Sequence, residues 1–185
     1  MTLVPDLGAY TPPPDFTRGR PSLVELVWMV VQAVFVSSFL PGSWHRRFLL
    51  RLFGATIGAK VVLKPGIRVK FPWRLSIGDH SWIGEQAWID NLAPVTIGAD
   101  CCVSQGAYLC TGSHDWTAPG FTLITRPITL EPGAWVAARA VVGPGVTIGR
   151  GAVLGLGSVA TRDLDAWTVY AGIPATAIKQ RVVAP

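Results

Sequence analysis

The stretch LEPGAWVAARAVVGPGVTIGRGAVLGLGS (residues 130–158) places an aliphatic side chain at every sixth position. Neither the 3.6-residue period of an amphipathic helix nor the alternation of an ordinary strand produces a period of six. Short strands separated by tight turns do produce it, because three hexapeptides complete one triangular coil and the aliphatic side chains stack inward. The stretch therefore predicts a parallel β-helix. Its in-phase residues are Leu130, Val136, Val142, Ile148 and Leu154.

The same period extends back to residue 57, with two-residue additions after Val69 and Ile89. Glycine directly follows many of the aliphatic positions, and we expect it to serve turns that need unusual backbone angles. The pattern predicts an all-β fold, a β-helix of about five coils over residues 57–164, in which each coil buries its apolar face against its neighbours. The further in-phase residues are Ile57, Leu63, Val69, Ile77, Ile83, Ile89, Ile97, Val103 and Leu109.

The segments outside the repeat divide the chain of 185 residues into one domain with appendages. We expect an extended, proline-rich arm over residues 1–20, an apolar and basic helical segment over 21–56, and a C-terminal tail over 165–185. The arm does not resemble a cleavable signal peptide, because it contains Asp6 and Asp15 instead of an apolar run. A cytoplasmic protein is therefore expected.

The charge is uneven along the chain. The net charge is +5, and ten of the basic residues precede Ile77, where only three acidic residues stand against them. This half of the chain should be attracted to an anionic partner such as a membrane surface or a phosphorylated ligand, or it is simply a solvated basic face. No nucleic-acid-binding motif is present, and nucleic acid is not expected as a partner. The three cysteines have no metal-binding spacing and are interpreted as small core residues in a reducing compartment: Cys101, Cys102 and Cys110.

The repeat is interrupted once by a long segment, which contains LCTGSHDWTAPG (residues 109–120). Leu130 stands twenty-one positions after Leu109, where one hexad would need six. Residues 111–127 must therefore leave the coil as a loop, and His114 stands at its root. Such a loop can be purely structural, but binding and catalytic residues are frequently carried by loops on rigid scaffolds.

Several motifs carry a resemblance to a known family. The histidine loop and the closing run GAVLGLGSVATRDLDAWTVYAGIPATAIKQR (residues 151–181) resemble the hexapeptide acyltransferases. The stretches LCTGSHDW, SWIGEQAWIDN and RRFLLRLFGATIG are most similar to the colanic-acid-type O-acetyltransferases of polysaccharide biosynthesis. The resemblance implies a left-handed coil, acetyl-CoA as co-substrate without a metal, and a homotrimer with active sites between subunits.

The resemblance assigns catalytic roles to specific positions. His114 occupies the place of the family's catalytic histidine, and histidine suits proton removal from a sugar hydroxyl because it ordinarily titrates near neutrality. The backbone amide of Ala138 matches the family's donor to the thioester oxygen. Asp90 and Asn91, which lie in the corner addition one coil earlier, are candidates to orient the histidine. Either of them can equally be a corner residue that satisfies local backbone amides.

Coenzyme A is implied to lie in a groove between coils of adjacent subunits. Lysine and arginine near the C-terminus suit its phosphates, although these cations can instead only solvate the tail. The matching positions are Trp135, Ala138, Gly155, Leu156, Thr161, Arg162, Pro174, Lys179 and Arg181.

Side chains near the loop are candidates for acceptor binding. Tryptophan can hold the apolar face of a sugar ring, but it is also common at subunit interfaces. Two of the candidates, Glu85 and Asp115, are also alternative partners for the histidine. The four substrate-binding candidates are Glu85, Trp88, Asp115 and Trp116.

The apolar stretch PSLVELVWMVVQAVFVSSFL (residues 21–40) is long enough to raise the question of a membrane. Three arrangements are open: a spanning helix, a peripheral helix at the inner face of the membrane using residues 21–52, or a helix packed only on the protein. Glu25 and Gln32 weaken the first, and the basic segment that follows favours the second.

The leading hypothesis is an acetyl-CoA-dependent O-acetyltransferase that modifies a sugar hydroxyl of a polysaccharide or exopolysaccharide precursor. Other acceptors, such as serine, an antibiotic or an amino sugar, stay open, as does a non-catalytic β-helix scaffold. A carbonic anhydrase of the same fold would need three zinc-binding histidines. His45 lies outside the coil and no HxxxxH spacing accompanies His114, so no metal site is expected.

Overall fold

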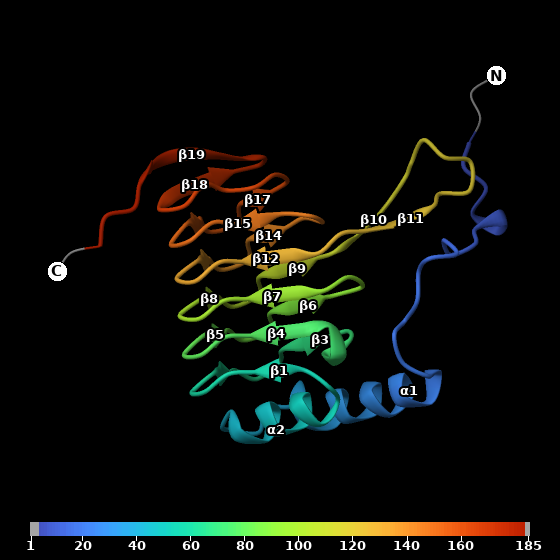
Figure 1. The fold of residues 1–185 in the computed structure, drawn as a ribbon, viewed down its shortest axis with the longest axis horizontal. Helices are drawn as coiled ribbons and strands as arrows, with labels where there is room; N and C mark the ends of the chain where they lie inside the picture. Colours follow the sequence, from blue (N-terminus) through green and yellow to red (C-terminus); the bar gives the residue numbers. More distant parts are fainter. Residues whose placement is uncertain (1–3, 184–185) are drawn as a thin grey trace.

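The computed structural model describes residues 4–183, which form a parallel β-solenoid of about six turns with three faces (Figure 1). The predicted β-helix is confirmed, with about one turn more than expected. Sheet 1 has the order β1 (Thr56–Ile57), β4 (Leu75–Ile77), β7 (Val95–Ile97), β12 (Ile128–Leu130) and β15 (Thr147–Ile148). Sheet 3 has the order β17 (Val159–Ala160), β14 (Val141–Val142), β9 (Tyr108–Cys110), β6 (Trp88–Asp90) and β3 (Arg68–Val69).

Sheet 2 is the largest face and includes part of the expected tail. It runs from β2 (Val62–Leu63) through β5 (Trp82–Ile83), β8 (Cys102–Val103), β13 (Trp135–Val136) and β16 (Val153–Leu154). It ends with β18 (Thr168–Gly172) and the antiparallel β19 (Ala175–Gln180). The expected C-terminal tail therefore contributes two strands to this sheet. Residues 1–3 and 184–185, the ends of the expected arm and tail, lie outside the described residues.

The core is the stack of in-phase aliphatic residues. Their strands pair in parallel with direct register, for example Ile57 with Ile77 and Ile77 with Ile97. All fourteen predicted positions are buried, and none is more than 6% exposed. Among the cysteines only Cys101 is fully buried; Cys102 and Cys110 are half-buried, so the expectation of three core cysteines is wrong for these two.

The glycines that follow the aliphatic residues have a different purpose from the one predicted. Left-handed backbone angles occur two residues later, for instance at His80 with φ 59°, whereas the glycines themselves lie against the next coil. A Cβ atom on Gly78 would stand 2.5 Å from the backbone nitrogen of Ala99. Close contact between coils, not an unusual φ, therefore requires glycine there.

Two helices close one end of the solenoid, beneath β1 (Figure 1). α1 (Ser22–Val31) continues into a π-helical turn, η2 (Gln32–Val36), and α2 (Trp44–Leu52) follows after a break, so the predicted helical segment is interrupted. Trp28, Val36 and Leu50 are buried against the first coil, and the indole of Trp28 donates a hydrogen bond to the carbonyl of Val69 (2.8 Å). No helix within residues 4–183 is long and apolar enough to cross a membrane.

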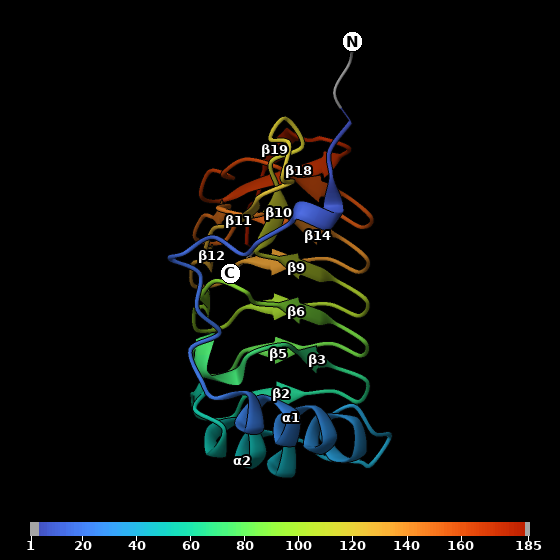
Figure 2. The same cartoon turned by 90° about the vertical axis from the view of Figure 1, so that its right-hand side faces the viewer.

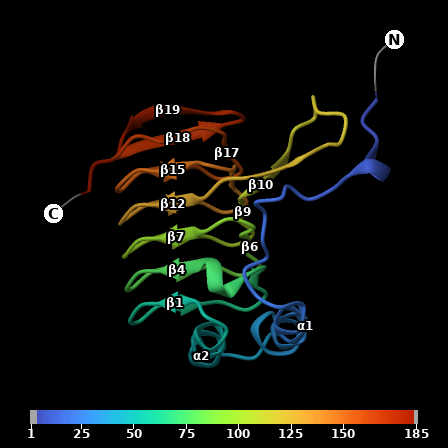
Figure 3. The ribbon, with the colours of Figure 1, turned by 45° about the vertical axis from the view of Figure 1, so that its right-hand side comes forward.

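The irregular segments all lie at one edge of the solenoid, between sheets 3 and 1. The first addition contains η3 (Pro72–Arg74), the second follows β6, and the third is a hairpin of β10 (Gly112–His114) and β11 (Leu123–Thr125). The N-terminal arm, which includes η1 (Leu7–Ala9), passes along the same side (Figures 2 and 3). This edge therefore carries the side chains that lie outside the six-residue pattern.

Candidate active site

The expected loop is an ordered hairpin that projects from the solenoid (Figure 1). His114 is the last residue of β10 and pairs with Leu123 of β11. At the base of the hairpin, the N–H of Arg126 donates to the carbonyl of Thr111 (2.9 Å). Antiparallel pairing thus gives His114 a fixed backbone position outside the coil.

The imidazole of His114 is held by Phe121, which sequence reasoning did not identify. Its Nδ1 lies 2.8 Å from the carbonyl oxygen of Phe121, and the two rings stack at 4.4 Å with an angle of 8° between their planes. A carbonyl oxygen can only accept a hydrogen bond, so Nδ1 must carry the proton. In the neutral ring, Nε2 then has the free lone pair that a general base needs.

His114 lies between two cavities. One, of about 290 Å³, is also lined by Asp115, Trp116 and Arg126. The other, of about 440 Å³, lies toward the N-terminal arm and includes Tyr10, whose ring meets the imidazole edge-on at 5.9 Å. The histidine can therefore contact a ligand from either side.

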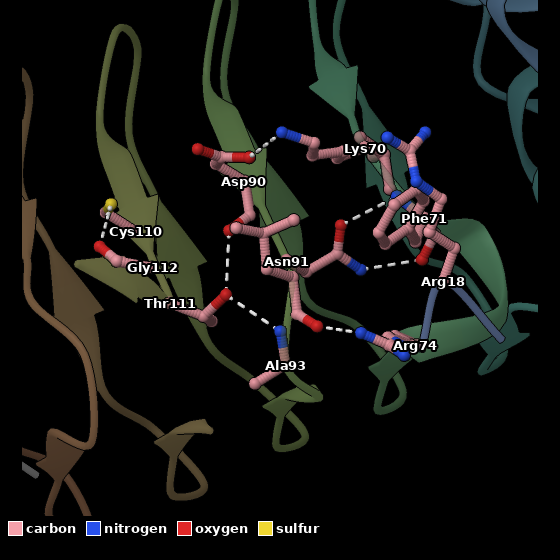
Figure 4. A network of polar contacts seen from close by, with 12 residues as sticks. Arg18, Lys70, Phe71, Arg74, Asp90, Asn91, Ala93, Cys110, Thr111 and Gly112 are labelled. Carbon is pink, nitrogen blue, oxygen red and sulfur yellow. Dashed lines mark hydrogen bonds and ion pairs between the residues drawn. The ribbon is translucent and has the colours of Figure 1, made fainter. Parts of the chain in front are cut away.

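The side chains of Asp90 and Asn91 contact residues other than His114, and Figure 4 shows Asp90 beside Lys70 and Asn91 beside Phe71. The Asn91 side chain is buried, accepts from the N–H of Phe71 (2.9 Å) and donates to its carbonyl (2.7 Å). Asp90 forms an ion pair with Lys70 (3.3 Å) and accepts from the hydroxyl of Tyr108 (3.1 Å). Within the described chain, the partner of the histidine is the Phe121 carbonyl, and Asn91 holds the corner additions together.

The acceptor candidates divide into two pairs. Asp115 and Trp116 line the smaller cavity with His114, and the indole of Trp116 is 75% exposed. The hydroxyl and the N–H of Thr117 both donate to the Asp115 carboxylate, and these hydrogen bonds lower the pKa of this carboxyl group. Asp115 is therefore a turn-forming carboxylate at the rim of the site.

The other two candidates lie elsewhere. The guanidinium of Arg68 lies 4.2 Å from the ring centre of Trp88, which stacks on Tyr108 at 4.6 Å. Because Arg68 and Tyr108 belong to the strands on either side of β6, they cover both faces of the indole. Glu85 lines a separate cavity on sheet 2 with Trp82. The structure brings neither Glu85 nor Trp88 to His114.

The hydroxyl of Tyr108 belongs to the network beneath the hairpin. Burial, the neighbouring Cys110 and the Asp90 carboxylate raise the pKa of Tyr108 far above its usual value. The hydroxyl therefore stays protonated and keeps donating to Asp90, which fixes the carboxylate that Lys70 contacts.

The expected cofactor positions are spread over several edges of one subunit. Trp135, Lys179 and Arg181 line one cavity of about 580 Å³ on sheet 2. The guanidinium of Arg181 donates to the carbonyls of Gly133 and Gly151 (2.9 Å each), so it fastens the chain to the coil in addition to lining the cavity. Gly155 and Leu156 follow β16, at the edge between sheets 2 and 3. Thr161 and Arg162 follow β17, at the edge that carries the hairpin. Pro174 lies between β18 and β19.

Ala138 lies on the turn between β13 and β14, an edge different from that of His114. Its carbonyl accepts from the N–H of Gly157 (3.0 Å), whereas its own N–H has no hydrogen bond to another residue in the described range 4–183. The equivalent turn residues Glu85 and Gln105 share this property. An available N–H therefore marks this turn position in the coil and is not special to Ala138.

The described residues contain no cluster of three or more histidine, cysteine, aspartate or glutamate side chains that could hold a metal ion. Besides Phe121 and Tyr10, sequence reasoning missed Arg18 and Lys70, which line the larger cavity with His114. The two-residue addition after Val69 was a usable signal for Lys70, because it places that residue on the same edge as the later hairpin. No sequence signal located Tyr10 or Arg18.

A solenoid of stacked hexads with a histidine hairpin at one edge defines a hexapeptide-repeat transferase, and residues 74–110 and 127–162 match the model of the hexapeptide repeat of succinyl-transferase. The chain belongs to the hexapeptide-repeat acyltransferase family and is an acetyltransferase. It is 41% identical over 177 residues, 96% of this chain and 97% of the relative, to the putative colanic acid biosynthesis acetyltransferase WcaF of Escherichia coli K12. It is 28% identical to the galactoside O-acetyltransferase of the same organism, over 73% of this chain and 68% of that protein.

Two solved structures share the fold. The hexapeptide-repeat acetyltransferase VCA0836 of Vibrio cholerae, in complex with acetyl coenzyme A, superposes with a TM-score of 0.80 at 24% identity, covering 88% of this chain and 89% of that chain. A galactoside acetyltransferase in complex with coenzyme A superposes with a TM-score of 0.76 at 25% identity, covering 86% of this chain and 81% of that chain.

Proposed function

We propose that the protein is an acetyl-CoA-dependent O-acetyltransferase that acts on a sugar hydroxyl of a polysaccharide or exopolysaccharide precursor, with His114 as the general base. The observation that carries this proposal is the hydrogen bond between Nδ1 of His114 and the Phe121 carbonyl, because it leaves Nε2 able to accept a proton. The similarity to WcaF and to a galactoside O-acetyltransferase supports a carbohydrate as the acceptor.

In this mechanism, Nε2 of His114 removes the hydroxyl proton while the sugar oxygen forms a bond to the thioester carbon. The Ala138 N–H stabilises the negative charge that develops on the thioester oxygen. The C–S bond then breaks, the proton returns from His114 to the sulfur, and the acetylated sugar and coenzyme A leave. His114 thereby regains its starting protonation state, and the proton of the sugar hydroxyl ends on the sulfur of coenzyme A.

The reaction needs more than one subunit. His114 follows sheet 3 at one edge of the solenoid, whereas Ala138 precedes sheet 3 at another edge. The sheet separates the two groups within a chain, so a neighbouring copy has to supply the amide. This supports a homotrimer with its active sites between subunits, because a closed ring makes every site equivalent.

The cofactor binds, in this proposal, along the upper coils. Trp135, Lys179 and Arg181 already share a cavity, and the two cations suit a phosphate or pyrophosphate. Arg162 and Thr161 lie on the edge of the hairpin and would meet the cofactor from the other subunit. The pantetheine arm would then reach the thioester site between them.

The finer location that we propose is peripheral, at the cytoplasmic face of a membrane. The outer face of α1 and the segment after it carries large apolar side chains that are about half or more exposed, a composition that is unusual for a solvated surface. The acidic Glu25 is only partly exposed and pairs with Arg18. The exposed apolar residues over 23–52 are Leu23, Leu26, Val27, Met29, Val30, Val34, Phe35, Phe39, Leu40, Trp44, Phe48 and Leu52.

The test compares His114→Asn with the matched control His80→Asn. His80 is half-exposed in a turn with φ 59°, a conformation that asparagine tolerates. The purified proteins are incubated with acetyl-CoA and free or lipid-linked oligosaccharides, and thiol release and product mass are followed. We expect His114→Asn to lose a factor of about 10²–10⁴ in kcat while it still binds acetyl-CoA, and His80→Asn to match the wild type.

Wild-type turnover in His114→Asn would refute the general-base role. If the wild type does not bind acetyl-CoA at all, the transferase proposal fails and a binding scaffold takes its place. If serine or an antibiotic is acetylated and no sugar is, the acceptor class is wrong although the chemistry stands.

A further inference from the structure

The larger cavity beside His114 is lined by cations as well as by apolar side chains. Arg18 comes from the N-terminal arm and Lys70 from the first corner addition, and both line the same space of about 440 Å³ as His114. Tyr10 and Phe16 contribute aromatic rings to the same wall. Among the residues that the structure describes, no acidic side chain lines this cavity.

Each cation has an acidic partner, but the partner is the buried member of the pair. Arg18 lies 2.8 Å from Glu25, and the side chains are 62% and 14% exposed, respectively. Lys70 lies 3.3 Å from Asp90, and the exposed fractions are 42% and 13%. The carboxylates therefore stand behind the cations, and the surface offered to a ligand is positively charged.

Both cations keep hydrogen-bond donors available. Arg18 contacts both oxygens of Glu25 through Nη1 alone, and no hydrogen bond from its Nη2 or Nε is present within residues 4–183. The ammonium of Lys70 has three donors and contacts one oxygen of Asp90. Guanidinium and ammonium groups with spare donors bind carboxylates and phosphates.

The arm is fastened on both sides of this cavity. The N–H of Asp6 donates to the carbonyl of Pro119 in the hairpin (2.9 Å), and the indole of Trp73 donates to the carbonyl of Arg18 (2.8 Å). Figure 3 shows the arm and the β10–β11 hairpin projecting on the same side of the solenoid. The position of Arg18 relative to His114 is thus set by contacts at each end of the arm.

We infer that the acceptor carries a negatively charged group, which Arg18 and Lys70 bind while the reacting hydroxyl meets His114. A carboxylate of an acidic sugar and the phosphate of a glycosyl phosphate share this chemistry. The inference rests on the proposed function, because only acetyl transfer makes the bound molecule an acceptor. The preference for a charged ligand can nevertheless be measured by binding alone. Arg18 and Lys70 are specificity residues in this scheme and take no part in proton transfer.

The experiment measures binding by the assembled protein at low ionic strength, using calorimetry or saturation-transfer NMR. The probes are 4-nitrophenyl β-glucoside, 4-nitrophenyl β-glucuronide and glucose 1-phosphate. The first two differ only in the group on C5, hydroxymethyl or carboxylate, and the third places its charge on C1. We expect at least one charged probe to bind about tenfold or more tightly than the neutral glucoside, and the preferred probe identifies the source of the charge.

Variants assign the preference to the two cations. Arg18→Gln and Lys70→Gln should each reduce the affinity for the charged probe about tenfold and leave that for the neutral glucoside unchanged. Lys70→Arg keeps the positive charge and should keep the preference for the charged probe. This variant separates the loss of a ligand-binding cation from the effect of leaving the Asp90 carboxylate without its ion pair. The matched control is Lys60→Gln, an exposed lysine in the first coil, which should behave as the wild type.

Equal binding of the charged and neutral probes, binding of none of them, or an unchanged preference when Arg18→Gln and Lys70→Gln are combined in one protein would overturn the inference. Failure of the proposed function has a different signature. In that case acetyl-CoA is not bound, or His114→Asn transfers acetyl groups as well as the wild type, whatever the charge preference of the cavity.

Discussion

Replacing Gly78 with alanine should destabilise the solenoid, because the space for a methyl group is already filled by the next coil. The added Cβ would lie 2.5 Å from the nitrogen of Ala99 and 2.7 Å from the carbonyl carbon of Gly98, and ordinary contact begins near 3.4 Å. Relief needs a local separation of about 0.9 Å, and this would stretch the 2.7 Å hydrogen bond from the Gly78 N–H to the Ile97 carbonyl beyond its normal length.

The overpacked contact and the weakened hydrogen bond together should lower the free energy of unfolding by about 3 kcal/mol. For a chain of this size, such a loss lowers Tm by roughly 6–12 °C. The measurement is thermal unfolding followed by circular dichroism, at equal protein concentration. The matched control is Gly120→Ala in the hairpin, where none of the described residues has an atom within 4 Å of the added methyl group and φ is not in the left-handed region. That variant should stay close to the wild type in Tm, and a Tm for Gly78→Ala within about 1 °C of the wild type would refute the close-contact argument.

Two further predictions concern the hairpin and the helices. Phe121→Ala removes the ring that stacks on His114 and should reduce kcat about 3- to 10-fold without changing the KM for acetyl-CoA. If the variant and the wild type have equal kcat values, the Phe121 carbonyl alone positions the imidazole. Leu26→Glu combined with Val30→Glu places two charges one turn apart on the exposed face of α1 and should abolish co-flotation with phosphatidylglycerol vesicles. The control Thr56→Glu, also at an exposed position, should still co-float. Vesicle binding by the double variant would exclude this face as the membrane contact.

The solenoid could be predicted because its core is a one-dimensional pattern. Each in-phase residue, such as Ile83 or Val136, stacks on the residue at the same place in the next coil, so sequence spacing translates directly into contact. The glycines were misinterpreted because their constraint comes from the neighbouring coil and not from their own backbone angles. The sixth turn could not be predicted because the period breaks after Ala160. Leu164 follows only four residues later and pairs with Ile148, and Tyr170, six residues further on, pairs with Leu154.

The site was predicted only in part. His114 could be located, because a long interruption in a regular repeat has to leave the coil. Its partner could not, since the acceptor is the backbone carbonyl of Phe121, and any residue type supplies a carbonyl. Of the two roles that the sequence left open for Asn91, the structure shows the corner residue, because its buried amide bonds to the backbone of Phe71. Arg18 approaches the site only through the path of the arm, which no periodicity records.

The distribution of irregularities explains how a repetitive fold acquires a specific site. A coil that repeats every six residues presents similar turns at every level, as the backbone N–H groups of Glu85, Gln105 and Ala138 illustrate, since none of them has a partner within residues 4–183. The residues that distinguish one ligand from another therefore have to come from departures from the repeat. The additions after Val69, Ile89 and Leu109 lie on one edge in three successive coils. Lys70, Asp90 and the hairpin with His114 are consequently stacked at the same edge. The chemistry of this protein is therefore concentrated where the repeat is broken, and the acceptor should depend on these additions more than on any residue of the regular coils.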